Sequence, residues 1–201
     1  MSASATHPTQ RLKPKPRQAI AAKVFHWVNL VSLVVMLGSG LQIYNSTPVF
    51  GGKDGWDFPK FLLIGGGLAA GRDWHFASMW FYSLNLLWYG VYVLLSRRWR
   101  HRFAHTQDWK ALKSQNQKRR NYTWHRLAYT AIVPILVLAI FSGLAMYKPV
   151  QFAWLFSLFR DWHTLRIIHF LTVPIAFGFT LLHFGLSLAV GKWRLVRSMF
   201  F

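Results

Sequence analysis

The chain has 201 residues, of which 53% are hydrophobic and 17% aromatic, and its formal net charge is +19 at pH 7. It contains no cysteine, which excludes disulfide bonds, thiolate catalysis, cysteine-bound iron–sulfur clusters and covalently attached haem. The basic residues flank apolar stretches and accompany no nucleic-acid-binding motif, so we expect membrane lipid rather than nucleic acid as their partner.

The N-terminal segment is polar and contains Pro8, Pro14 and Pro16. It lacks the apolar core of a secretory signal peptide. We therefore predict that residues 1–19 form a disordered, basic cytoplasmic tail. The remainder, residues 20–199, is predicted to form a single membrane domain.

Four apolar stretches without a charged side chain follow in chain order, and each is long enough to cross a bilayer as a helix. Spanning backbone groups must be hydrogen-bonded within the protein, so a helical bundle is the simplest architecture. The sequence thus predicts an all-α integral membrane protein with four transmembrane helices. They cover about residues 23–45, 73–96, 122–147 and 161–192.

Basic residues gather before the first stretch, in the loop of residues 97–120 and after the fourth stretch. The positive-inside rule places all three regions, and both chain termini, in the cytoplasm. Apolar segments at residues 61–71 and 152–159 are too short to span, so we predict that they lie at the outer membrane surface. This topology predicts a multi-pass protein of the bacterial inner membrane.

Histidines lie at matching depths of different predicted helices. His169 and His183 are fourteen residues apart, which puts both rings on one helix face, about 21 Å apart along the axis. Depth pairs His183 with His26 near the cytoplasmic side, and His169 with His75 near the outer side. Imidazoles are ordinary axial ligands of haem iron, and ionisable residues at membrane depth are usually functional. The pattern predicts two b-type haems enclosed by the bundle.

His163 competes with His169 for the role of outer ligand. The sequence Arg-Asp-Trp-His occurs at both 72–75 and 160–163, which suggests two related hairpins. His163, however, lies at the predicted water boundary, nearly on the opposite helix face from His183. We favour His169 as the ligand and expect His163 to cap its helix or to contact a haem propionate.

Other polar residues near the predicted haems also invite a role. Arg72 and Arg166 are placed to bind the propionates of the outer haem, and Arg126 those of the inner haem. His125 is left without a pairing partner: it lines a quinone pocket, accepts a proton or lies at the membrane interface. Asp108 is the other candidate for proton exchange near a quinone.

The histidine pattern resembles the prokaryotic cytochrome b561 family over about residues 20–199. The resemblance rests on His26, the Gly-Arg-Asp-Trp-His-Phe stretch at 71–76, the Arg-Ile-Ile-His-Phe stretch at 166–170, and His183. That family includes the cytochrome b subunits of nickel–iron hydrogenases, formate dehydrogenases and thiosulfate reductases. The resemblance implies four helices, the same ligand pairing, a quinone site near the inner haem and a periplasmic enzyme, in one subgroup a molybdopterin oxidoreductase, as partner.

Two functions follow as hypotheses. The leading one is a di-haem b-type cytochrome of the respiratory chain that transfers electrons between a periplasmic redox partner and membrane quinone. The alternative is a self-contained superoxide:quinone oxidoreductase of the same fold. A proton-relaying transporter is not expected, because the four predicted helices contain no Asp or Glu beyond Asp73 and Asp161 at their boundaries. The sequence leaves open whether the chain is itself an enzyme, and whether it forms a homo-oligomer.

Overall fold

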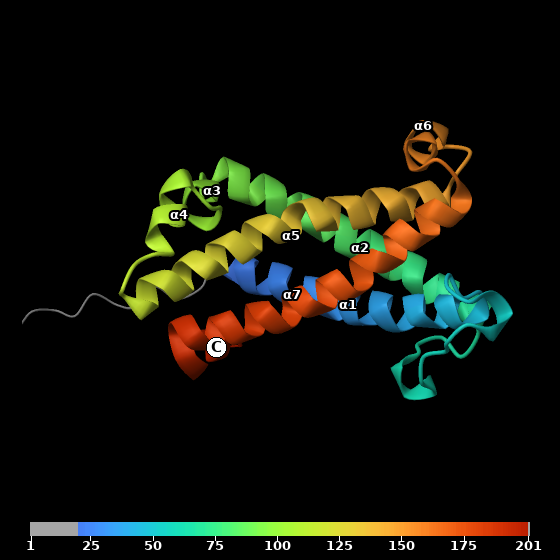
Figure 1. The fold of residues 1–201 in the computed structure, drawn as a ribbon, viewed down its shortest axis with the longest axis horizontal. Coiled ribbons are helices and arrows are strands. Elements are labelled where there is room, and N and C mark those ends of the chain that lie inside the picture. The colour runs from blue at the N-terminus through green and yellow to red at the C-terminus, as the bar shows by residue number, and fades with distance from the viewer. Residues whose placement is uncertain (1–19, 201) are drawn as a thin grey trace, which may run out of the picture.

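The computed structural model describes residues 20–200, so the predicted tail of residues 1–19 lies outside the described part of the chain. The described residues form four long helices and several short ones, without any strand. The long helices are α1 (Ile20–Ser46), α2 (Leu68–Leu95), α5 (Gln117–Tyr147) and α7 (Trp162–Arg197) (Figure 1). The short ones are α3 (Trp99–Arg102), α4 (Thr106–Ala111), α6 (Ala153–Phe156) and the 3-10 turns η1 (Gly52–Asp54), η2 (Lys60–Leu62) and η3 (Ser157–Phe159).

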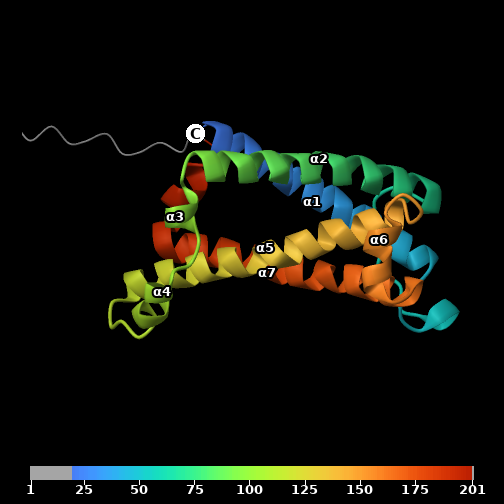
Figure 2. The same cartoon turned by 90° about the horizontal axis from the view of Figure 1, so that it is seen from above.

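The long helices pair as two hairpins. α1 packs along α2 and α5 packs along α7, whereas the two hairpins touch each other at few points. Figure 2 shows α1 and α2 on one side and α5 and α7 on the other. The start of α1, the end of α7 and the loop with α3 and α4 share one end of the bundle, which we call the inner end (Figure 1). Helix α6 and the α1–α2 connection share the opposite, outer end.

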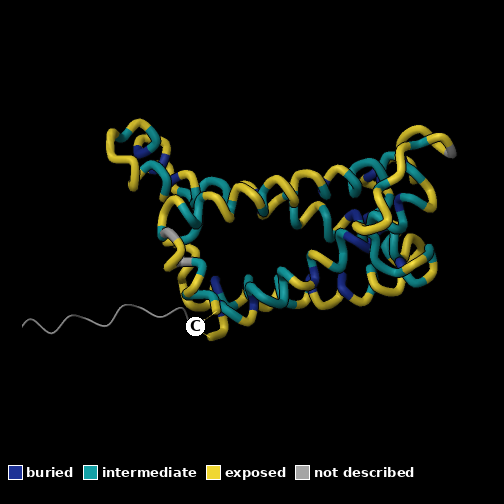
Figure 3. Tube along the Cα trace, turned by 90° about the horizontal axis from the view of Figure 1, so that it is seen from below, coloured by how far each residue is buried: buried dark blue, intermediate teal, exposed yellow. Residues whose placement is uncertain are grey.

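Three of the long helices, α1, α5 and residues 162–191 of α7, are long and apolar enough to cross a membrane. The chain is therefore a multi-pass membrane protein. Helix α2 is 28 residues long but is not among these three, because its Trp, Tyr, Ser and Asn side chains have low hydropathy. Along all four helices much of the surface is apolar and exposed, and the fully buried residues gather toward the outer end (Figure 3).

Helix α2 begins at Leu68, earlier than the predicted start at Asp73. The turn before it depends on glycine, because Gly65 has φ +120° and a Cβ there would lie 2.5 Å from the backbone nitrogen of Gly71. The backbone N–H of Ile64 donates to the carbonyl oxygen of Gly38 at 3.0 Å, which holds this segment against α1. Asp73 therefore lies within the helix, where its side chain is exposed.

Helix α6 and turn η3 close the outer end between α5 and α7. Leu155 and Phe159 are buried there against Ala145 of α5 and Leu165 of α7. Trp154 on the opposite side of α6 is 65% exposed. The segment predicted to lie at the membrane surface is thus a short amphipathic lid, with one face on the helices and one face outward.

Candidate functional site

His75 of α2 and His169 of α7 face one another near the outer end of the bundle. Each lies seven residues after the first residue of its helix, Leu68 or Trp162. Their ring centroids are 6.3 Å apart and the ring planes make an angle of 79°. The two hairpins therefore present one imidazole each at the same depth. We call this the outer pair.

The separation of the outer pair fits two ligands of one haem iron. A metal–imidazole bond of about 2 Å on each side, with the radius of each ring added, gives about 6 Å between centroids. The Nδ1 atom of each ring is already engaged by the protein, which leaves Nε2 to bind a metal. Two axial imidazoles on a b-type haem are an ordinary donor set.

A cavity of about 60 Å³ adjoins the outer pair and is lined by all four long helices. Its walls are apolar apart from the two imidazoles, Tyr82 and Thr172, and include Leu33, Met36, Leu37, Ile135, Leu136, Ala139, Val173 and Ala176. A haem is larger than this cavity, so lining side chains would move apart to admit it. The cavity lies on the middle side of the pair, where an apolar macrocycle would be sheltered from water.

A serine hydroxyl touches each imidazole of the outer pair. Ser39 Oγ lies 3.3 Å from His75 Nδ1, and Ser142 Oγ lies 2.9 Å from His169 Nδ1. His75 Nδ1 is also 3.1 Å from the carbonyl oxygen of Met36. Both serines are completely buried. Ser39 of α1 thus contacts the histidine of its paired helix α2, and Ser142 of α5 contacts the histidine of its paired helix α7.

His163 is exposed in the first turn of α7, away from the outer pair. Its sequence match with His75 is not a match in the structure, because α2 extends further before its Arg-Asp-Trp-His stretch than α7 does. By helix position and by serine contact the counterpart of His75 is His169. The two hairpins therefore resemble one another in the contacts of these two histidines, whereas the repeated Arg-Asp-Trp-His residues do not occupy equivalent positions.

Three histidines gather toward the inner end, His26 of α1, His125 of α5 and His183 of α7. The ring centroids of His125 and His183 are 5.2 Å apart, with 41° between the planes. His26 is close enough to His183 to interact with it electrostatically. Phe179 stacks on His183 with ring centroids 5.7 Å apart. We call the three residues the inner histidine group.

The distance between the His125 and His183 rings indicates that His125 is a neighbour of His183 and does not share a metal with it. At 5.2 Å the rings of His125 and His183 are closer than two imidazoles that share one metal between them. Residues 20–200 contain no group of three or more His, Cys, Asp or Glu arranged to hold a bare metal ion. A haem needs only two axial ligands from the protein, so the inner group suits haem better than an ion.

Arg126, which was predicted to bind a propionate of the inner haem, is bonded to other groups of the protein in this structure. Its Nη1 donates to Asp108 Oδ1 at 3.1 Å, and its Nε donates to the carbonyl oxygen of Phe103 at 3.1 Å. Asp108, one of the two candidates for proton exchange, is the other half of this ion pair and is buried. Arg102, another cation of the inner loop, has its guanidinium 5.7 Å from the ring centre of Tyr89.

The outer arginines occupy equivalent places in the two hairpins. Arg72 and Arg166 each precede an outer-pair histidine by three residues, so each lies beside its histidine on the helix surface. Arg72 is exposed. Arg166 donates to the carbonyl oxygen of Thr47 at the end of α1. Arg72 is thus accessible to an anionic group at the outer end, whereas Arg166 is engaged by α1.

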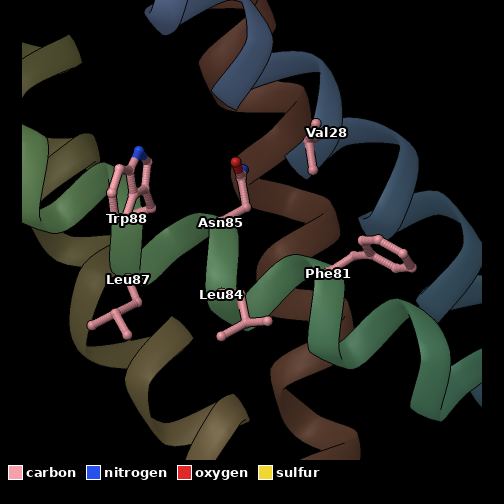
Figure 4. Close-up of a pocket in the computed structure, with 6 residues that line it drawn as sticks. All are labelled: Val28, Phe81, Leu84, Asn85, Leu87 and Trp88. Atoms are coloured by element: carbon pink, nitrogen blue, oxygen red, sulfur yellow. The ribbon is translucent and has the colours of Figure 1, made fainter.

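A separate groove of about 430 Å³ lies between α1 and α2 (Figure 4). It is lined by Val28, Phe81, Leu84, Asn85, Leu87 and Trp88. The amide of Asn85 donates to the carbonyl oxygen of Phe25 and to Asn29 Oδ1, at 2.9 and 2.8 Å. These bonds tie the two helices of the hairpin together, so the polar group in the groove has a structural role.

Comparison with known proteins fits the histidine geometry. The prokaryotic cytochrome b561 family matches residues 17–201. The chain belongs to that family. A relative from Azospira oryzae, provisionally named protein-methionine-sulfoxide reductase subunit YedZ1, is 29% identical over 180 residues, which are 85% of this chain and 89% of the relative. No solved structure matches.

Membership of the cytochrome b561 family assigns this membrane protein a haem b and a role in electron transfer. The sequence predicts four histidines as haem ligands, which stays a prediction, but it did not indicate the contacts of Ser39 and Ser142. A signal was present, since Ser-Gly-Leu occurs at 39–41 and again at 142–144. The repeated Ser-Gly-Leu sequence indicated a repeat but not the serine–histidine contacts, because these contacts depend on which helices pair.

Proposed function

We propose that this cytochrome is a di-haem b electron-transfer subunit of the bacterial inner membrane. It would carry electrons between a periplasmic redox partner and the quinone pool. The observation that carries the proposal is the placement of two histidine groups between the same two hairpins, one toward each end of α7. His169 and His183 are separated along that helix by about 21 Å, which is most of the hydrocarbon core of a bilayer.

The ligands we propose are His75 with His169 for the outer haem and His26 with His183 for the inner haem. The outer assignment is supported by the 6.3 Å ring separation. When bound, each haem iron accepts and donates one electron, with a potential tuned by ligand and surroundings. The chain contributes the axial nitrogens, an apolar wall around the outer site and a fixed distance between the two.

We further propose that α2 spans the membrane with the other three long helices. Its outward side carries large apolar residues such as Leu84 and Leu94, which are 58% and 63% exposed and suit contact with lipid. The basic α3–α4 loop and the end of α7 share the inner end. The positive-inside rule then places the inner end, with both termini, in the cytoplasm.

Outer-haem propionates would be held by Arg72 and Arg166, which lie one helical turn before the outer pair. For the inner haem, Arg126 would serve only if it shared its guanidinium with Asp108 and the Phe103 carbonyl. His125 is proposed to line the quinone site, because it contacts the ring of an inner ligand without being its partner across the iron.

A partner enzyme is favoured over self-contained oxidation of a small molecule such as superoxide. The Azospira oryzae relative is named as a subunit of a reductase, which supports a redox enzyme as partner of this chain as well; that this enzyme is periplasmic and of the molybdopterin class is our proposal from the family resemblance. The outer surface also offers exposed aromatic side chains at Trp56 and Trp154, 67% and 65% exposed, for membrane or partner contact.

The haem-to-protein ratio tests the proposal, measured with a reduced-minus-oxidised spectrum on purified protein. We expect two b-type haems in the wild type, one in His169→Ala and two in His163→Ala, which is the matched control on the same helix. A single haem in the wild type would rule out a two-haem path across the membrane. One haem in His163→Ala and two in His169→Ala would transfer the outer ligand to His163.

A second experiment tests the electron partners. Protein reduced with dithionite, then freed of excess reductant, should be reoxidised by a short-chain quinone without any added protein. Reduction by superoxide at a comparable rate, with no partner enzyme present, would support the self-contained oxidoreductase instead.

A further inference from the structure

We propose that Ser39 and Ser142 are positioning residues which fix the tautomer and the ring orientation of the two outer ligands. The inference rests on the proposed function, since it concerns how His75 and His169 are prepared to bind iron. It adds two residues that neither the histidine pattern nor family membership identifies. The argument starts from where the hydrogen of each serine hydroxyl goes.

Each hydroxyl donates its single hydrogen to its own helix. Ser39 Oγ lies 2.6 Å from the carbonyl oxygen of Val35, and Ser142 Oγ lies 2.6 Å from that of Leu138. These carbonyl oxygens can only accept, so the serine is the donor in both bonds. Toward the imidazole, the serine oxygen is therefore left as an acceptor.

An acceptor beside Nδ1 requires that Nδ1 carry the ring hydrogen. The carbonyl oxygen of Met36, 3.1 Å from His75 Nδ1, imposes the same requirement because it too can only accept. A neutral imidazole protonated at Nδ1 has its lone pair on Nε2, which is the form that binds a metal. Both outer ligands are thus held in the ligating tautomer before any haem arrives.

Glycines beside the serines fix the position of each ring. A Cβ at Gly40 would lie 3.3 Å from Cε1 of His75, and a Cβ at Gly143 would lie 3.2 Å from Cε1 of His169. Each imidazole is therefore seated directly against the backbone of the neighbouring helix. Rotation of the ring would break the serine contact and press the ring on the helix.

The same device occurs in both hairpins. In each, a Ser-Gly pair on the first helix contacts the histidine seven residues into the second helix. Both serines are 0% exposed, so water does not compete for these bonds. A buried donor that loses its acceptor is costly, which makes the arrangement rigid. The two Ser-Gly pairs thus hold the imidazoles of the outer pair with 79° between the ring planes.

The electronic consequence has a definite sign. An acceptor on Nδ1–H makes the ligating nitrogen more basic and so favours ferric over ferrous iron. Loss of the serine oxygen should therefore raise the midpoint potential of the outer haem. Ser142 should have the larger effect, because its contact of 2.9 Å is shorter than the 3.3 Å contact of Ser39.

The test is a redox titration of Ser142→Ala, with the outer haem identified as the component that is lost in His169→Ala. We expect two haems and about a tenfold higher ferrous-to-ferric ratio of the outer haem at a fixed potential, which is about 59 mV for one electron. The inner haem should be unchanged. Ser32→Ala, which removes a buried hydroxyl from α1 away from the outer pair, is the control and should shift neither haem.

Electron paramagnetic resonance of the ferric protein gives a second readout that loss of stability alone would not move. The outer-haem signal should change in Ser142→Ala, because the ring is released from its fixed plane, and should return toward the wild type in Ser142→Thr, which restores a hydroxyl. If Ser142→Ala fails to fold, Ser39→Ala tests the same device in the other hairpin. A wild-type potential and signal in folded Ser142→Ala, or in Ser39→Ala where Ser142→Ala does not fold, would overturn the inference, whereas a wild type without an outer haem would overturn the proposed function itself.

Discussion

Arg126 and Asp108 form an ion pair of 3.1 Å whose side chains are only 14% and 10% exposed. Arg126 lies on α5, whereas Asp108 lies on the short helix α4 of the inner loop. Asp108 also accepts from the backbone N–H of His105 at 2.7 Å, and the backbone N–H of Ala104 donates to Thr130 Oγ1 at 2.8 Å. These bonds fasten the basic loop to the inner half of α5.

Breaking this pair should loosen the inner loop. We expect Arg126→Gln and Asp108→Asn each to lower the free energy of unfolding by about 3 kcal/mol, because each leaves a largely buried charge without its partner. The double variant should cost less than the sum of the two. Thermal unfolding in detergent, followed by circular dichroism, measures the effect. Unchanged stability together with loss of the inner haem would instead make Arg126 a propionate ligand.

The start of α7 should be sensitive to acid. Asp161 caps this helix, and the backbone N–H of Thr164 donates to its carboxylate at 2.8 Å, which holds the Asp161 pKa below its usual range. A lowered pKa means that the charged form stabilises the folded state above the unfolded pKa of about 3.9, and that this contribution is lost as the pH falls through the folded pKa. Asp161→Ala should therefore be less stable than the wild type at pH 7, with the difference shrinking below about pH 4. A difference in unfolding temperature that did not depend on pH would contradict this.

Gly143 should not tolerate a side chain. A methyl group there would lie 3.2 Å from Cε1 of His169, so Gly143→Ala should displace the ligand and weaken outer-haem binding by about tenfold. Gly90→Ala is the matched control, because no atom lies within 4 Å of a Cβ at that position. Haem retention during titration with a competing haem-binding protein measures the difference. Equal retention in the two variants would mean that the imidazole has room to move.

His26 and His125 should differ in what they bind. We expect His26→Ala to lose one haem, because its imidazole is the proposed partner of His183, and His125→Phe to retain two. In His125→Phe we expect slower reoxidation by quinone. Haem content and stopped-flow reoxidation separate the two roles. The opposite haem contents would assign His125 as the inner ligand and His26 as its neighbour.

Much of the helical fold was predictable because long charge-free runs are read directly from the sequence. The start of α2 was not predictable, because three successive glycines, Gly65 to Gly67, are typical of a loop and the helix begins immediately after them at Leu68. Depth along α7 was enough to propose His75 as the outer partner of His169. It used only the helical rise and the topology, which do not depend on detailed packing.

The contacts around the histidines were harder to predict. Ser39 and Ser142 gain their meaning only when α1 is known to pair with α2 and α5 with α7. Arg126 was assigned to a propionate because its depth matched the inner haem, but its actual partner comes from a loop whose folding no periodic pattern describes. The depth of a residue in the membrane can be predicted from the sequence. Whether Arg126 binds a propionate or Asp108 at that depth can be decided only from the structure.

The sparse contact between the two hairpins has a consequence for biogenesis. Each hairpin is internally well packed and carries half of every proposed ligand pair, so it can insert into the bilayer as an independent unit. Besides the bridging cofactors, the halves would then be joined by a limited set of side-chain contacts, such as Tyr44 with Phe170 and Trp27 with the Met199 carbonyl. Cofactor delivery and closure of the bundle would be a single event, and a cell short of haem would accumulate inserted but unjoined hairpins, which are natural substrates for membrane quality-control proteases.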